Sequence, residues 1–425
     1  MKKIIDYINN KVLVRVVWLH SATVFTKIFA GFLTTKFIAI FIGAEGLALI
    51  GNLRNFLTAV QSFATLNLYN GIVKFIGEFK NDLTKLSKIL STVYYIGFVS
   101  MFSISLLCYF NSDFINYIIF SDRFNYGYVI KILAIALPFY ALNMFSFSIM
   151  NGFAKYKFLM IINIIGQIMG LCVTLILIWQ DKIDGALVSV VISPSLIFLI
   201  TVVGIVNRRN FISHLKVSNI DFQLIKKLSP FSLMAIVSGF ALPFVMIAIR
   251  NYIIKVEGME AAGYWEAMNR IFVYYLMFVN SIMTLYFLPR FQEIENKKEF
   301  RKEVFDFYKT MIPVFAMGLL VIYLLRTFII TLFLTDEFAH VEALFGWQLL
   351  GDLVKVLAVV IAYQFIAKKM LVHFIITELF LVVMLYVSSI YFIDLFGVKG
   401  ANIAHFVSYV FYYIIVLMIF GSSLF

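Results

Sequence analysis

Long apolar runs separated by short polar segments cover the whole chain. Each run is long enough to cross a bilayer core, which is about 30 Å thick and takes about 20 residues of α-helix. The pattern predicts helices at 12–42, 46–76, 87–110, 128–152, 157–179, 185–206, 229–254, 263–289, 308–333, 343–367, 370–393 and 399–421. We therefore expect an all-α integral membrane protein with about twelve transmembrane helices.

Composition agrees with this membrane class. Hydrophobic residues make up 62% of the 425 residues and charged residues 14%, whereas soluble domains contain about 45–50% and about 25%. The two cysteines, Cys108 and Cys172, both lie inside apolar runs, so they predict packing residues and no disulfide. No polar segment is long enough to form a soluble domain.

The formal net charge of +12 follows the loops. Every second polar segment is rich in Lys and Arg: 2–11, 74–88, 155–157, 208–227, 290–302 and 368–369. By the positive-inside rule these segments and both termini face the cytoplasm. The positive charge is thus a topology signal, with contact to anionic membrane lipids as a minor role, and we expect no nucleic-acid partner.

A weak internal repeat divides the helices into two sets of six. Short matches recur at offsets of 213 to 217 residues: Gly46 and Asn52 with Gly263 and Asn269, Arg54 and Lys74 with Arg270 and Arg290, Ala154 with Ala367, and Gly185 with Gly400. Because six is even, the repeats are parallel, with a pseudo-twofold axis along the membrane normal. The predicted domains are a six-helix lobe at 1–210, a cytoplasmic linker at 211–228 and a second six-helix lobe at 229–425.

Polar side chains inside the first two predicted helices are the first candidates for function. Arg54, Thr58 and Gln61 share one face of the second helix at helical spacing. Lys27 lies on a polar stripe of the first helix, and Lys36 lies off that stripe, from where it can reach the outer interface. A cation at the bilayer centre costs about 2.5–3.5 kcal/mol on insertion scales, so Arg54 and Lys27 are expected to face water or an anion.

The second half carries ionisable residues of both signs. Glu266 and Arg270 are four residues apart and predict an ion pair. Asp352 and Lys355 form either a structural pair or part of an ion-coupling site, and Glu378 is open to the same two interpretations.

The embedded charges have a positive surplus. The cations are Lys27, Lys36, Arg54, Arg270 and Lys355, against the acids Glu266, Asp352 and Glu378. A cavity of this sign favours an anionic substrate, and a diphosphate is the most concentrated anionic charge that a membrane lipid commonly carries. No His and acidic residues have metal-ligand spacing, so no metal site is predicted.

Four stretches resemble one family over nearly the whole chain: residues 27–36, 46–54, 69–74 and 347–355. They are similar to Wzx-type flippases of the multidrug/oligosaccharidyl-lipid/polysaccharide exporter superfamily, and in particular to O-antigen translocases and flippases of enterobacterial common antigen. The matching positions carry over Lys27, Lys36, Arg54, Lys74, Asp352 and Lys355 as the polar motif residues of the family.

The resemblance implies two lobes around a cationic cavity that opens alternately to the cytoplasm and the periplasm of a bacterial inner membrane. The substrate would be an undecaprenyl-diphosphate-linked oligosaccharide, with contact to the polysaccharide polymerase machinery. No cofactor is implied, although an H⁺ or Na⁺ gradient could drive the cycle through Asp352, Glu378 or Glu266. Catalytic residues are not expected.

Two rival functions remain open from the sequence. A cation-coupled multidrug antiporter of the same superfamily predicts an acid-dominated cavity, against which the surplus of cations counts. A polysaccharide polymerase predicts a large periplasmic loop with catalytic residues, whereas all predicted loops are short. The chain also contains no Walker sequence, which argues against direct use of ATP.

Overall fold

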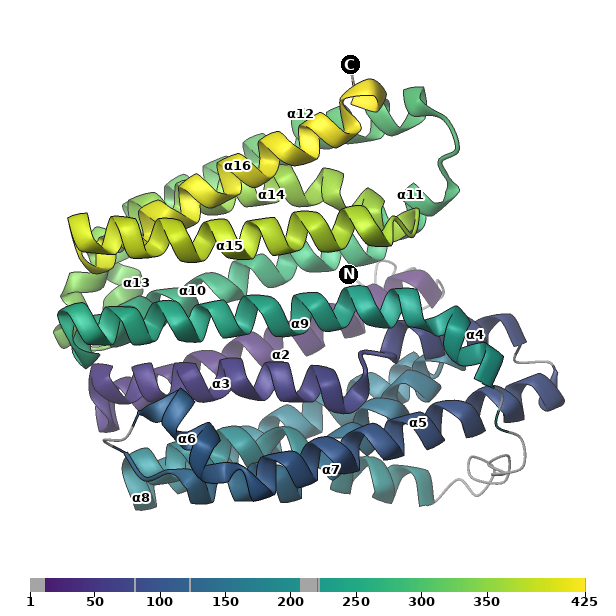
Figure 1. Ribbon diagram of the computed structural model, residues 1–425, viewed down its shortest axis with the longest axis horizontal. Helices are drawn as coiled ribbons and strands as arrows, with labels where there is room; N and C mark the ends of the chain where they lie inside the picture. Colours follow the sequence, from purple (N-terminus) through teal and green to yellow (C-terminus); the bar gives the residue numbers. More distant parts are fainter. Residues whose placement is uncertain (1–11, 80–81, 122–123, 207–219, 221, 425) are drawn as a thin grey trace, which may run out of the picture. The chain divides into compact units, whose positions relative to one another are not determined.

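The computed structural model describes residues 12–79, 82–121, 124–206, 220 and 222–424, and in this part of the chain all regular structure is helical (Figure 1). The helices up to the middle of the chain are α2 (Val12–Phe41), α3 (Gly43–Thr65), α4 (Tyr69–Phe79), α5 (Leu83–Phe110), α6 (Ser112–Phe120), α7 (Gly127–Gly152) and α8 (Tyr156–Val206). They are followed by α9 (Phe222–Glu257), α10 (Met259–Ile282), the π-helical turn η2 (Met283–Phe287), α11 (Leu288–Glu293), α12 (Lys297–Leu324), α13 (Arg326–Phe333), η3 (Asp336–Leu344), α14 (Phe345–Ala367), α15 (Leu371–Phe396) and α16 (Val398–Leu424).

The predicted membrane helices correspond to these elements with ends shifted by a few residues. Nine of the described helices are long and apolar enough to cross a membrane by length and composition. One of them, α8, holds two spans, because its backbone leaves the helical conformation at Asp181 (φ −121°) and Lys182 (φ +45°). The remaining two spans are α3 and α10, whose polar residues lower their hydropathy. The protein is a multi-pass, all-α membrane protein with twelve such spans in its described part.

One predicted helix is broken. The sequence predicts a single helix over 46–76, but α3 ends at Thr65 and a short α4 begins at Tyr69. Leu66 and Asn67 between them have positive φ angles of 50° and 46°. The Asn67 amide donates to the Ala235 carbonyl at 2.8 Å, so a tertiary contact holds this break where the local sequence has no glycine or proline.

The chain folds into two compact units. Unit 1 comprises Met1–Thr34 and Leu57–Ile236, and unit 2 comprises Thr35–Phe56 and Val237–Phe425. The chain therefore passes from one unit to the other inside α2, α3 and α9. The predicted linker at 211–228 lies mostly outside the described residues, and the predicted lobe boundaries stay a prediction.

Within each unit the helices pack side by side. In unit 1, α7 packs along α8, α5 and α4, and in unit 2, α16 packs between α14 and α15 (Figure 1). Outward-facing positions are apolar, as a lipid environment requires: α12 alone exposes Met311, Val314, Met317 and Leu320.

The internal repeat reappears as matching turns in the two units. The turn after α7 has Ala154 at φ +56°, and the turn after α14 has Lys369 at φ +56°, 215 residues later. The three amides that close each turn donate to carbonyls at the same spacings in both units. The sequence alone matches Ala154 with Ala367, so the structure moves this alignment by two residues.

A second pair of turns has the same offset. Lys182 (φ +45°) in α8 corresponds to Gly397 (φ +64°) before α16. In both units a glycine follows three residues later, at Gly185 and Gly400, and a Cβ there would lie about 2 Å from a carbonyl oxygen eight residues earlier. Since both ends agree, α14 and α16 can be compared with α7 and the second half of α8 residue by residue.

The starts of α5 and α12 also correspond. Asp82 accepts a hydrogen bond from the Lys85 amide at 3.1 Å, and Asn296 accepts one from the Glu299 amide at 2.8 Å. This bond lowers the pKa of the Asp82 carboxyl. Both helices are 28 residues long.

Candidate functional site

Unit 2 contains a buried cluster of charges on α3, α9 and α10. The Glu266 carboxylate accepts hydrogen bonds from the Arg250 guanidinium and from Arg270 Nε, the latter at 2.9 Å. Arg250 also donates to Asn52 Oδ1 at 2.7 Å, and the Asn52 amide donates to Asn251 Oδ1 at 2.8 Å. The expected pair of Glu266 with Arg270 is confirmed, and the structure adds Arg250 as a second cation on the same carboxylate.

A third arginine makes this cluster strongly positive. Arg54 is half-buried on α3, close enough to interact electrostatically with both Arg270 and Glu266. Three guanidinium groups therefore share one carboxylate. Arg250 also lies over the Trp265 ring, 5.2 Å from its centroid, which offsets part of its desolvation.

Several donors of the cluster have no hydrogen-bond partner within the described part of the chain. They are Nη1 and Nη2 of Arg270 and Nε of Arg250, together with the side-chain amides of Asn55 and Asn269. A buried unpaired donor costs about 1–3 kcal/mol, and more when it is charged. Two unpaired nitrogens on one guanidinium match the two oxygens of a phosphate or carboxylate group.

Two glycines allow the helices around the cluster to approach. A Cβ at Gly51 would lie 2.6 Å from Glu266 Cδ and 2.9 Å from Arg250 Cζ. A Cβ at Gly263 would lie 2.0 Å from the Ala44 carbonyl oxygen, which is backbone and cannot move aside. The absence of side chains at these two positions is therefore a condition for the ion pairs.

A second buried polar network joins α10, α14 and α16. Asp352 is fully buried and accepts hydrogen bonds from the Tyr275 hydroxyl and from the Gln348 amide, the latter at 3.2 Å. His405 Nε2 lies 3.0 Å from Asp352 Oδ1, and the Asn402 amide donates to Gln348 Oε1 at 2.9 Å. We call these five residues the Asp352 network.

Lys355 and Glu378 lie next to this network. The Lys355 amine is 5.2 Å from the centroid of the Tyr409 ring and interacts electrostatically with both Asp352 and Glu378. Glu378 accepts a hydrogen bond from Ser238 on α9. Asp352 thus has His405 and Tyr275 as its hydrogen-bonding partners, and Lys355 balances two acids without a direct bond to Asp352 among the described ion pairs.

The predicted site residues divide between the two units. Lys27, Thr58 and Gln61 belong to unit 1, and Lys36, Arg54, Arg270, Lys355 and the three acids belong to unit 2. Lys27 and Thr58 are exposed and Gln61 is half-buried. Their role in substrate binding stays a prediction.

Lys36 has a position of its own. Its amine donates to the Thr331 carbonyl at 2.8 Å and to the Leu334 carbonyl, at the C-terminal end of α13. These carbonyls have no partner within the helix, and a lysine stabilises them. The contact explains the position of Lys36 in the fold, and its predicted substrate contact is untested.

Sequence reasoning missed two residues of these clusters. Arg250 lies near the predicted end of its helix, where a cation is usually interfacial. His405 is expected from the sequence to be a packing or hydrogen-bonding residue, and its partner Asp352 is 53 residues away. A signal was present for Arg250, because Gly51 and Asn52 face it, but only the tertiary structure shows that contact.

The family follows from a comparison with known proteins. Residues 53–343 match the family model described as polysaccharide biosynthesis protein. This chain belongs to that family. The matched range contains Arg54 and the whole of the α9 and α10 part of the charged cluster.

Two curated relatives align over nearly their full length. The lipid III flippase of Escherichia coli (strain K12) is 27% identical over 396 residues, which covers 92% of this chain and 94% of the relative. The lipid III flippase of Shigella flexneri matches to the same extent.

Solved structures show the same fold. An inward-facing multidrug resistance MATE family transporter of the MOP superfamily has a TM-score of 0.76 at 13% identity and covers 93% of this chain and 95% of its own. The lipid II flippase MurJ in an inward closed conformation has a TM-score of 0.71 at 16% identity, with 96% and 87% covered. The fold is therefore that of two-lobed MOP superfamily transporters.

Proposed function

We propose that this protein is a flippase that moves an undecaprenyl-diphosphate-linked oligosaccharide from the cytoplasmic to the periplasmic leaflet. The observation that carries the proposal is the cluster of Arg54, Arg250 and Arg270 around the single acid Glu266. The family and the two lipid III flippase relatives support the same substrate class.

The cluster suits a diphosphate because its charge is not balanced. Arg250 and Arg270 share the Glu266 carboxylate, which leaves Arg54 and the terminal nitrogens of Arg270 to meet an anion. Guanidinium groups bind phosphate oxygens in pairs and keep their charge when buried. Lys27 of unit 1 is proposed as a further contact of the diphosphate or sugar, together with Thr58 and Gln61.

The cycle needs no covalent step. Alternating access would expose the arginines to one leaflet and then to the other, while the prenyl chain stays in lipid. Coupling to an H⁺ or Na⁺ gradient is proposed for the Asp352 network with Glu378, because these buried acids have polar partners on three helices. Glu266 is a weaker candidate, since two arginines already neutralise it.

The charge pattern supports an orientation with both termini in the cytoplasm of a bacterial inner membrane. In that orientation Glu257, Asp394 and the acidic part of η3 face the periplasm. The substrate would reach this side with its glycan exposed, where contact with the polysaccharide polymerase machinery becomes feasible.

A leaflet-specific transport assay tests this function. Inverted vesicles that contain the wild-type protein, Arg54→Ala, Arg54→Lys or the control Lys131→Ala would receive lipid-linked oligosaccharide, and the translocated fraction would be measured with a glycan-cleaving enzyme on one side. We expect Arg54→Ala to lower the rate by about tenfold or more, Arg54→Lys to retain part of it, and Lys131→Ala, an exposed residue of α7, to match the wild type.

Normal translocation by Arg54→Ala would contradict the cationic mechanism. Export of a cationic dye by the same vesicles, without movement of the lipid-linked oligosaccharide, would instead favour the multidrug antiporter.

A further inference from the structure

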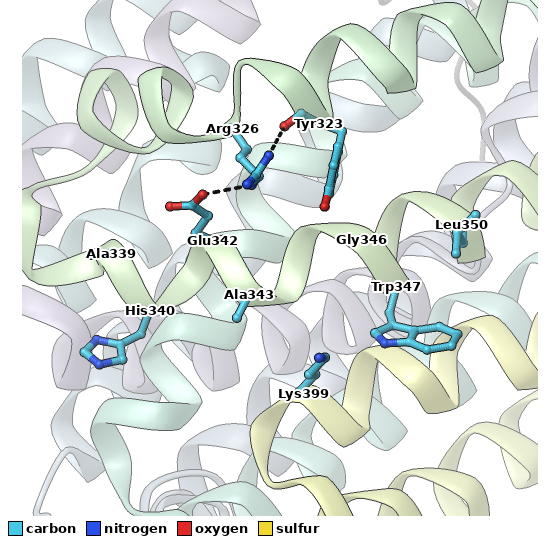
Figure 2. A pocket seen from close by; sticks show the side chains of 10 residues that line it. All are labelled: Tyr323, Arg326, Ala339, His340, Glu342, Ala343, Gly346, Trp347, Leu350 and Lys399. Carbon is cyan, nitrogen blue, oxygen red and sulfur yellow. Dashed lines mark hydrogen bonds and ion pairs between the residues drawn. The ribbon is translucent and has the colours of Figure 1, made fainter.

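A separate pocket lies in unit 2, away from both buried clusters. It has a volume of about 590 Å³ and is bordered by the end of α12, the start of α13, η3 and the starts of α14 and α16 (Figure 2). In the proposed orientation this is the periplasmic end of the unit. The size is in the range of pockets that bind small organic ligands, about 300–1,000 Å³.

The pocket combines flat rings with fixed hydrogen-bonding groups. Arg326 Nε lies 2.9 Å from Glu342 Oε1, and Arg326 Nη1 donates to the Tyr323 carbonyl at 2.9 Å. The same guanidinium lies over the Tyr323 ring, 4.5 Å from its centroid. Figure 2 shows these three residues gathered on one side of the pocket, with Trp347 and Lys399 on the other.

These groups remain accessible although they are held in place. The Arg326 side chain is 29% exposed and that of Glu342 is 36% exposed, so both can still reach a ligand. Trp347 is half-buried and packs against Phe406 with ring centroids 5.7 Å apart, which fixes the orientation of the indole. The pocket is thus preorganised and not a loose set of surface side chains.

The charge of the pocket distinguishes between two ligand classes. A phosphate headgroup requires cations, and here Glu342 neutralises Arg326 and presents a carboxylate to the same space. A polyhydroxylated ligand suits this arrangement better, because a carboxylate accepts from hydroxyl groups and a guanidinium donates to them. The apolar face of a sugar ring packs well on an indole, and Lys399 adds a donor for an acidic sugar.

The matching positions of unit 1 lack this chemistry. At the offsets given by the turns, Arg326 corresponds to Ser112, Trp347 to Ile132 and Lys399 to Asp184. The pocket is therefore not a by-product of the repeated fold. Trp and Tyr are common at membrane interfaces, but an interfacial ring needs no ion pair beside it.

We propose that this pocket binds the saccharide part of the translocated lipid at the periplasmic side. The inference rests on the proposed function for the identity of the sugar, but it makes a separate claim, namely that glycan binding here is independent of the diphosphate cluster. A pocket that holds the sugar on arrival would oppose return of the substrate to the cytoplasmic side.

The test is direct binding of a sugar that carries no diphosphate. The probe is the oligosaccharide released by mild acid from the lipid-linked pool of the producing cells, and the full-length protein in nanodiscs is titrated with it by isothermal calorimetry. The variants are Trp347→Ala, Arg326→Gln and, as a matched control, Trp179→Ala, which removes an exposed tryptophan of unit 1. Thermal unfolding of each variant verifies the fold.

We expect saturable binding by the wild type and the control, about tenfold weaker binding by Trp347→Ala and by Arg326→Gln, and no displacement by glycerol 3-phosphate. Arg326→Gln keeps the proposal testable if Trp347→Ala loses packing against Phe406. The proposal is overturned if the wild type does not bind the oligosaccharide, if the two folded pocket variants bind as the wild type does, or if glycerol 3-phosphate displaces the sugar.

The vesicle assay separates this inference from the proposed function. Transport by the wild type together with unchanged binding by the pocket variants would reject only the pocket. Binding that depends on Trp347 without any transport would reject only the flippase.

Discussion

The two units share a backbone plan but bury different polar groups. At the offset of 215 residues, Gln348, Asp352, Asn402 and His405 of unit 2 correspond to Leu133, Leu137, Leu187 and Val190 of unit 1, all of them buried. The fold itself therefore tolerates aliphatic side chains at all four positions. What the comparison teaches is that the Asp352 network is not required to hold α14 against α16.

The opposite exchange also occurs. In unit 1 the Thr201 hydroxyl donates to Asn143 Oδ1 at 2.6 Å, and the corresponding residues of unit 2 are Ala358 and Val416, both fully buried. Unit 1 thus joins α7 to α8 with a neutral hydrogen bond, while unit 2 has charged groups between the equivalent helices. Neutral pairs of this kind stabilise packing at little desolvation cost.

Removal of the acid from the arginine cluster should have the largest effect on stability. Glu266→Gln leaves Arg250 and Arg270 buried without a counter-charge, and breaking a buried pair costs about 3–5 kcal/mol. We expect a clear fall in the thermal unfolding midpoint in detergent and a low yield. Glu260→Gln, in the exposed first turn of α10, is the control and should unfold at the wild-type temperature. A Glu266→Gln midpoint equal to that of the wild type would show that the cluster is not electrostatically coupled.

Transfer of the unit 1 residues into unit 2 should separate folding from transport. The variant Gln348→Leu, Asp352→Leu, Asn402→Leu, His405→Val, with Tyr275→Phe to avoid an orphaned hydroxyl, replaces the whole Asp352 network by apolar groups. Such replacements are often neutral or stabilising, by about 1–4 kcal/mol. We expect an unfolding midpoint at or above that of the wild type and transport reduced by about tenfold or more.

The same comparison can be broken by a single outcome of that experiment. If the variant folds and still translocates substrate at the normal rate, the network has no role in the cycle. If Asp352→Asn alone abolishes gradient-driven transport but leaves slow downhill movement, the acid acts in coupling.

Loss of the neutral pair should have the smallest effect. Thr201→Val keeps the shape of the side chain and removes the donor to Asn143, which costs about 1 kcal/mol. We expect a slightly lower unfolding midpoint and normal transport in vesicles. Thr310→Val, an exposed threonine of α12, is the control. A transport defect in Thr201→Val at unchanged stability would mean that unit 1 also carries functional polar groups.

Much of the fold was predictable because hydropathy is a local property. The twelve spans and the repeat follow from apolar runs and short matches, and the structure confirms both. The break after α3 was not predictable, since Leu66 and Asn67 adopt positive φ angles through tertiary contacts such as the bond from Asn67 to Ala235.

The candidate site was predictable only in part. The pair of Glu266 with Arg270 is a spacing of one helical turn, and the sequence shows it. The partners Arg250 and His405 come from distant helices, and their contacts depend on packing that no local pattern encodes. For the same reason the pocket around Trp347 could not be inferred, although Trp347 itself lies in a stretch that resembles the flippase family.

The paired turns also provide positions for spectroscopic labels. The chain has two cysteines, Cys108, which is buried, and Cys172, which is exposed, so two substitutions give a background free of thiols. Cysteines introduced at Ala154 and Lys369 would carry nitroxide spin labels on equivalent turns of the two units. The distance distribution between those labels, recorded with and without substrate, would report directly on the conformational cycle in a lipid bilayer.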